Sequence, residues 1–111
     1  MKDHKEQYNI LDKNSFYNAF IGFENKHLPI NINIPINKNT PYIYLSFYWN
    51  SQTINGKFNP IMTASLIDIR NDTNILNDLV FDCVKEKITT DYKLYKKLND
   101  WILEGLKNEL Q

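Results

Sequence analysis

The sequence predicts an α+β domain: an N-terminal helix, a three-stranded antiparallel meander and two C-terminal helices packed on one sheet face. Three observations predict this class. Apolar residues recur at helical spacing near both ends of the chain, the segments between alternate apolar and polar residues, and an Asn-Gly pair at 55–56 separates two of these segments. With 111 residues the chain has the size of a single domain, in which the polar residues 1–12 form a lead-in.

The first predicted element is an amphipathic helix over residues 15–27. From Phe16 onward, apolar residues recur at intervals of three and four. Asn14 or Ser15 can serve as the N-cap, and Pro29 lies just past the predicted end.

The next segment, PININIPIN, is predicted to be an edge strand. Its isoleucines alternate with Asn and Pro, which places the isoleucines on one face. Pro35 cannot donate to a ladder, so the strand belongs at an edge of the sheet. Pro29, Pro35 and Pro41 have the same parity and lack N–H groups on the same lateral side. If that side faces solvent, no ladder bond is lost and pairing with another chain is discouraged.

Two alternating segments, YIYLSFYW (42–49) and IMTASLIDI (61–69), are predicted to form a hairpin. A turn centred on Asn55-Gly56 suits type I′ geometry, which needs positive φ at both central residues. This centre fixes the register, which we list for the inner face: Trp49 faces Met62, Phe47 faces Ala64, Leu45 faces Leu66 and Ile43 faces Asp68. A bulge at Pro60 is an alternative that would shift the register by one and exchange the two faces.

The outer face of this hairpin is the candidate partner-binding surface. It carries Tyr42, Tyr44, Tyr48, Thr63, Ser65 and Ile67. Tyrosine combines a large contact area with a polar tip and is enriched in protein interfaces. Tyrosine and threonine are also good strand formers, and half-exposed rings on a sheet that bind nothing are one structural alternative. A face covered by the N-terminal segment or by a helix is a second alternative.

After the NDTN turn signal at 71–74, helical spacing of apolar residues predicts a helix over residues 76–88. A fourth strand through LVFDCV (79–84) is the alternative, and Phe81 supports it because this side chain lies off the helical stripe.

The last element is a helix over about 20 residues that begins near Asp91. Thr89, Thr90 and Asp91 supply its cap, and a broad apolar stripe runs from Leu94 to Leu110.

Composition argues against several functional classes. The net charge is zero, and the chain contains three glycines, two histidines and one cysteine. A glycine-rich phosphate loop cannot be built from so few glycines, and no metal-ligand spacing is present. We therefore expect no enzyme activity, no cofactor and no metal site, with Cys83 as a buried structural thiol. No segment reaches the roughly 20 apolar residues of a membrane span, so we expect a cytoplasmic protein that does not associate with membranes.

The leading functional hypothesis is a small non-enzymatic protein-binding module that neutralises or occludes another protein. Toxin-immunity proteins and phage or mobile-element inhibitors are of this type, and the bias toward Asn, Ile and Lys indicates a low-GC bacterial or phage genome. A homodimer through the outer face is an alternative use of the same surface.

The hypothesis from another class is a nucleic-acid-binding accessory protein that uses the Lys- and Tyr-rich segment 85–97. Lys93, Lys96 and Lys97 would contact the phosphates and nearby rings would stack on bases. The zero net charge and the neighbouring Asp91 and Asp100 argue against it.

Overall fold

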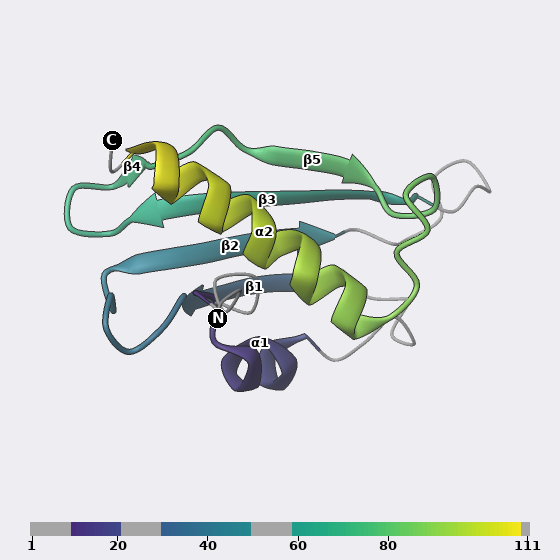
Figure 1. The fold of residues 1–111 in the computed structure, drawn as a ribbon, viewed down its shortest axis with the longest axis horizontal. Helices are drawn as coiled ribbons and strands as arrows, with labels where there is room; N and C mark the ends of the chain where they lie inside the picture. Colours follow the sequence, from purple (N-terminus) through teal and green to yellow (C-terminus); the bar gives the residue numbers. More distant parts are fainter. Residues whose placement is uncertain (1–9, 21–29, 50–58, 110–111) are drawn as a thin grey trace, which may run out of the picture.

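A computed structural model describes residues 10–20, 30–49 and 59–109, and it confirms the α+β class. The elements are α1 (Lys13–Ala19), β1 (Ile30–Pro35), β2 (Ile43–Trp49), β3 (Ile61–Asp68), β4 (Thr73–Asn74), β5 (Leu79–Asp82) and α2 (Asp91–Glu109). Figure 1 shows α2 running diagonally across one face of the sheet, with α1 beyond the β1 edge. Two predicted features are wrong: the described sheet has five strands rather than three, and one C-terminal helix replaces two.

The hairpin of β2 and β3 has the predicted register. All seven pairs of this antiparallel ladder agree with it, from Ile43 opposite Asp68 to Trp49 opposite Met62. The inner face is buried as expected, since Leu45, Phe47 and Trp49 are fully inaccessible to solvent. The Asn55-Gly56 turn lies outside the described residues, but the ladder that it was used to predict is in place.

β1 is an edge strand, as its prolines predict. Among the described strands it pairs with β2 alone, and Ile32 lies opposite Phe47. The Ile36 N–H donates to the Ile43 carbonyl at 2.9 Å, so residues of even number bond β2 and residues of odd number point to the free edge. Pro35 therefore occupies a position whose N–H would point to solvent, where proline costs no ladder bond.

The predicted helix over 76–88 is wrong, and the alternative strand is present as β5. Along β5 the side chains alternate with a period of two: Phe81 is buried whereas Val80 is 61% exposed. Between the Ile67–Asn74 and Ala64–Leu79 pairs, β3 has two residues and the opposite chain has four. This two-residue excess is a bulge, and because it is even, Leu79 and Phe81 stay on the core face.

α1 is shorter than predicted and begins earlier. Asp12, rather than Asn14 or Ser15, is the N-cap, and its carboxylate accepts hydrogen bonds from the Ser15 N–H (3.0 Å) and hydroxyl (2.8 Å). Phe20 has extended backbone angles and ends the helix, although its side chain continues the apolar stripe into the core. The rest of the predicted helix, residues 21–27, lies outside the described residues.

α2 is confirmed and supplies the covering layer of the core. Thr90 begins it, since the Thr90 hydroxyl accepts from the Lys93 N–H at 3.2 Å. Leu94, Leu98 and Ile102 are fully buried on its sheet-facing side. The core that they share with the inner sheet face also holds Leu11, Phe16, Phe20, Ile30, Ile32, Ile36, Leu45, Phe47, Trp49, Met62, Ala64, Leu66, Phe81, Cys83, Ile88 and Tyr95.

Two polar side chains of α2 hold the backbone just before α1. Asn99, only 5% exposed, accepts a hydrogen bond from the Leu11 N–H at 2.9 Å. The Tyr95 hydroxyl donates to the Leu11 carbonyl. Both backbone groups of a fully buried residue are thereby paired, which avoids the cost of an unsatisfied buried peptide group.

Tyr95 predicts a loss of stability at alkaline pH. Its pKa is raised from 10.0 to about 12, chiefly because burial disfavours the phenolate. Since the folded-state pKa lies above the unfolded value, the contribution of neutral, buried Tyr95 to stability is complete below pH 10.0 and is lost as the pH rises toward about 12. We expect ionisation of Tyr95 to lower the free energy of unfolding by on the order of 2 kcal/mol across that window, measured by urea unfolding.

Tyr95→Phe is the comparison that isolates this effect. Burial also raises the pKa values of Cys83 and Tyr17, but both groups titrate in wild type and variant alike. The variant should be less stable near pH 7 by about 1 kcal/mol and should lose less stability at alkaline pH. Parallel pH profiles for the two proteins would show that Tyr95 is not the group responsible.

Candidate functional site: the uncharged sheet face

The six residues predicted to bind a partner lie on one face of the sheet, opposite the face that α2 covers. Tyr48 pairs with Thr63, Ser46 with Ser65 and Tyr44 with Ile67, so their side chains stand side by side on that face. Tyr42 precedes β2, and its carbonyl accepts from the Ile69 N–H at 3.0 Å, which continues the same row. The structure thus brings Tyr44, Tyr48, Thr63, Ser65 and Ile67 together, with Tyr42 at the end of their row.

The strand residues of this face are almost free of charge. The outward-facing strand residues are Asn31, Asn33, Pro35, Tyr44, Ser46, Tyr48, Ile61, Thr63, Ser65, Ile67, Asn74, Val80 and Asp82. Asp82 is the one charged member among them, at the end of β5. Its carboxylate accepts from the backbone N–H groups of Val84 and Lys85, both at 2.9 Å, and so stabilises the following turn. We call this set of side chains, together with Tyr42 and Ile69, the open face.

Several apolar side chains of the open face are exposed to solvent. The exposed fractions are 43% for Tyr48, 41% for Ile61, 52% for Ile69 and 61% for Val80. No helix or strand in the described part of the chain covers this face, because α2 lies on the other side and α1 lies beyond the β1 edge, in contact with β1 and α2 (Figure 1). Exposed apolar and aromatic side chains grouped on one surface are typical of interaction sites.

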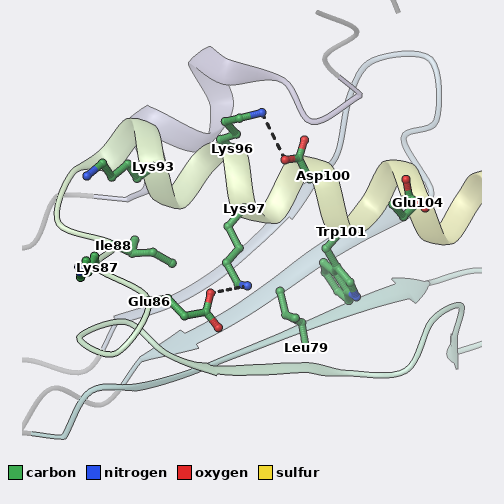
Figure 2. A pocket seen from close by; sticks show the side chains of 10 residues that line it. All are labelled: Leu79, Glu86, Lys87, Ile88, Lys93, Lys96, Lys97, Asp100, Trp101 and Glu104. Carbon is green, nitrogen blue, oxygen red and sulfur yellow. Dashed lines mark hydrogen bonds and ion pairs between the residues drawn. The ribbon is translucent and has the colours of Figure 1, made fainter. Parts of the chain in front are cut away.

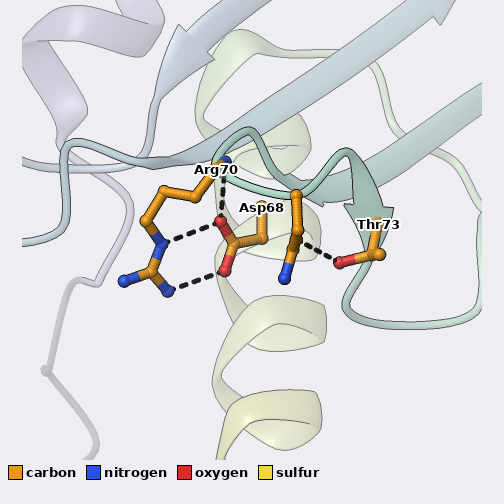
Figure 3. Close-up of polar contacts among 4 residues, drawn as sticks. Asp68, Arg70 and Thr73 are labelled. Carbon is orange, nitrogen blue, oxygen red and sulfur yellow. Dashed lines mark hydrogen bonds and ion pairs between the residues drawn. The ribbon is translucent and has the colours of Figure 1, made fainter.

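The Tyr42 ring is held in place by a cation. The Arg70 guanidinium lies 3.6 Å from the centre of the ring and also binds both carboxylate oxygens of Asp68, at 3.0 and 2.7 Å (Figure 3). These hydrogen bonds hold the pKa of Asp68 below its ordinary value. The fixed guanidinium restricts the ring, so Tyr42 would lose less freedom than a mobile side chain on binding a partner.

Catalytic chemistry finds no support in the described residues. Cys83 is 3% exposed, and burial raises the pKa of its thiol, which keeps it protonated and unreactive at neutral pH. Both histidines, His4 and His27, lie outside the described residues. No group of three His, Cys, Asp or Glu side chains that could hold a metal occurs within residues 10–20, 30–49 and 59–107.

The three lysines of the nucleic-acid hypothesis line a single pocket beside α2, but two of them are paired with carboxylates (Figure 2). Lys96 Nζ lies 3.3 Å from Asp100, one helical turn away. Lys97 Nζ lies 2.6 Å from Glu86 and 5.0 Å from the centre of the Phe81 ring. These pairs neutralise part of the charge that phosphate binding would need.

Sequence reasoning missed the extent of both surfaces. Val80 joins the open face only because β5 is a strand, and a helix prediction gave it no such position. Its signal was the alternation of Val80 and Phe81, which the helical spacing of neighbouring residues outweighed. The pocket beside α2, with Trp101 and Leu79 in its wall, likewise depends on β5 and on the turn that follows.

Neither described helix is long and apolar enough to cross a membrane. No family model, curated protein or solved structure gives a significant match to this chain.

Proposed function

We propose that this chain is a small non-enzymatic protein-binding module that neutralises or occludes another protein, in the manner of toxin-immunity proteins and phage or mobile-element inhibitors. The open face is the surface that binds. The single observation that carries the proposal is the makeup of this face: its strand residues are tyrosine, isoleucine, valine, proline, asparagine and small hydroxyl residues, and its charges lie at the rim, Asp82 at the end of β5 and Arg70 against Tyr42.

This composition matches what stable protein interfaces require. The centre of an interface is depleted in charged residues and enriched in tyrosine, because charges are costly to remove from water and rings bury a large area. Charged residues make up 23% of the whole chain, so one charge among the outward-facing strand residues is a local departure from its composition. The hydroxyl and amide groups on the face can pair with backbone or side-chain groups of a partner.

The expected partner surface is therefore flat and largely uncharged, with aromatic or aliphatic side chains at its centre. A sheet face offers no deep groove, and shape complementarity to it needs another broad surface. A second copy of this chain meets that description, and the oligomeric state in the absence of a partner separates self-association from binding of another protein.

The test is retention of a partner by the immobilised chain when the products of flanking open reading frames are expressed alongside it. We expect Tyr44→Ala combined with Tyr48→Ala to weaken the complex by about 30-fold or more, equivalent to about 2 kcal/mol, because tyrosines at an interface centre dominate binding. Isothermal titration calorimetry on the purified pair gives the affinity.

Tyr92→Ala is the matched control. Tyr92 is also an exposed tyrosine, at 55%, but it lies on α2, away from the open face. Its replacement should leave the affinity unchanged. If the double variant still retains the partner, or if Tyr92→Ala loses it equally, the binding surface lies elsewhere. If the wild-type chain retains no protein at all, the proposed function is contradicted.

Nucleic-acid binding is the competing proposal, and it has less support because Lys96 and Lys97 are ion-paired. It predicts binding to single-stranded DNA that weakens steeply with salt and is reduced by Lys93→Gln. Such a result, combined with intact behaviour of the open-face variants, would replace the protein-binding proposal.

A further inference from the structure

A second candidate site lies on the other side of the sheet, in the pocket between α2 and the β5 strand with its following turn (Figure 2). The pocket has a volume of about 570 Å³. This size falls within the roughly 300–1,000 Å³ that is usual for small-molecule sites. The open face plays no part in it, because the pocket is formed on the helix-covered side of the sheet.

One end of the pocket is apolar. Trp101 and Leu79 are both partly exposed, and Figure 2 shows their side chains next to each other, Trp101 from α2 and Leu79 from β5. A flat ring system or a short alkyl chain placed against them would remove further apolar area from water.

The other end is cationic. Lys87 and Lys93 both lie at the end of the pocket away from Trp101 in Figure 2, and neither forms an ion pair with a described carboxylate. Lys96 and Lys97, by contrast, have Asp100 and Glu86 as partners. Lys93 precedes Trp101 by eight residues, which corresponds to about 12 Å along the helix axis.

Lys87 occupies an unfavourable backbone conformation. Its φ is 59°, in the left-handed region, where the turn is closed by hydrogen bonds from the Lys87 N–H to the Val84 carbonyl (3.0 Å) and from the Ile88 N–H to the Cys83 carbonyl (2.8 Å). Glycine adopts this conformation without steric cost, so a lysine here makes the fold less stable than it could be. Backbone strain of this kind concentrates at functional sites, and here it accompanies a cation at the end of a pocket.

We propose that this pocket binds a small amphipathic anion. Its apolar body packs on Trp101 and Leu79, and its carboxylate or phosphate group pairs with Lys87 and Lys93. Glu104, which lines the pocket at the Trp101 end, repels an acidic group and so directs it toward the lysines.

Two-dimensional amide NMR titrations of the full chain test the ligand class. The probes are 2-naphthoate, its neutral counterpart 2-naphthamide, decanoate and inorganic phosphate. We expect 2-naphthoate to shift the Trp101 indole N–H and the Leu79, Lys87 and Lys93 amides, and to bind about fivefold or more tighter than 2-naphthamide. If decanoate binds as tightly as 2-naphthoate, alkyl acids are equally suitable ligands. If decanoate binds more weakly, the pocket prefers an aromatic acid.

Lys87→Gly separates binding from folding. Removing the strained side chain should raise the melting temperature by about 3 °C or more while weakening 2-naphthoate binding about fivefold. Asp72→Gly is the matched control, because Asp72 also has positive φ (56°) but lies in the β3–β4 turn, outside the pocket. Asp72→Gly should leave 2-naphthoate binding unchanged.

Lys93→Gln should weaken 2-naphthoate binding as Lys87→Gly does. Lys85→Gln should not, because Lys85 lies on the same turn as Lys87 but outside the pocket lining.

Several results would overturn the proposal: no shift of Trp101 or Leu79, equal binding of the acid and the amide, inorganic phosphate as tight as 2-naphthoate, or affinity unaffected by both Lys87→Gly and Lys93→Gln. None of these outcomes bears on the open face, so the proposed protein-binding function stands or falls separately.

Discussion

Phe47→Ala is expected to lower the free energy of unfolding by about 3–5 kcal/mol, the usual cost of removing a buried aromatic ring. Phe47 is fully buried on the inner face of β2, between Ile32 of β1 and Ala64 of β3. Its ring also meets Phe20 edge to face, with 6.2 Å between the ring centres. Small neighbours such as Ala64 cannot fill the resulting cavity. Urea unfolding followed by circular dichroism measures the loss.

Tyr48→Ala, one residue along the same strand, is the control that tests whether the two faces differ. Tyr48 is 43% exposed on the open face, so its loss should cost about 1 kcal/mol or less, mainly through strand propensity. If Tyr48→Ala proved as destabilising as Phe47→Ala, the open face would be covered in the folded protein and could not be the binding surface.

Asn99→Ala is the second substitution with a large expected effect, at about 2–3 kcal/mol of unfolding free energy. It removes the acceptor of the Leu11 N–H and leaves this donor unpaired in the core, where water cannot replace the lost bond. Hydrogen exchange at the Leu11 amide should accelerate along with the loss of stability in urea unfolding.

Asp100→Ala, at the next position of α2, is its matched comparison. Asp100 is exposed and pairs with Lys96 at 3.3 Å, and an exposed pair of this kind contributes about 0.5 kcal/mol or less. Equal losses in the two variants would mean that the contact between α2 and residue 11 carries little of the stability of the domain.

The two layers assign different tasks to the two sides of the sheet. The inner face and α2 bury the aromatic and aliphatic side chains that stabilise the fold. The open face carries tyrosines that the core does not use, and the proposed binding function depends on them. Substitutions on the open face can therefore abolish partner binding in a protein that stays folded, which makes the proposal testable without loss of structure.

Some of the structure followed from local pattern alone. The alternation in residues 42–49 and 61–69, combined with the Asn-Gly centre, predicted the β2–β3 register residue by residue. A one-residue slip would have placed Phe47 and Trp49 in water, and this penalty makes register a property that sequence specifies strongly. The alternating isoleucines and Pro35 predicted β1 as an edge strand, because proline cannot donate a ladder hydrogen bond and is therefore disfavoured in the interior of a sheet.

Other features required long-range contacts. Residues 79–84 form a short, almost continuous apolar run, which periodicity alone cannot assign to a helix or a strand. Pairing with β3, which places Phe81 opposite Met62 and Leu79 opposite Ala64, decides for the strand. The apolar pattern also does not show that α1 ends at Ala19, because the Phe20 side chain continues the helical stripe into the core while its backbone is already extended.

The sequence by itself determined which side chains of the central hairpin face inward, because side-chain alternation and turn geometry are local properties. It therefore also identified Tyr42, Tyr44 and Tyr48 as residues of a common outer face. Only the tertiary structure decided that no described helix covers this face, that Lys96 and Lys97 are paired with carboxylates, and that Lys87 and Trp101 border one pocket. These facts depend on where separate elements meet in space, and the period of one segment carries no information about its neighbours.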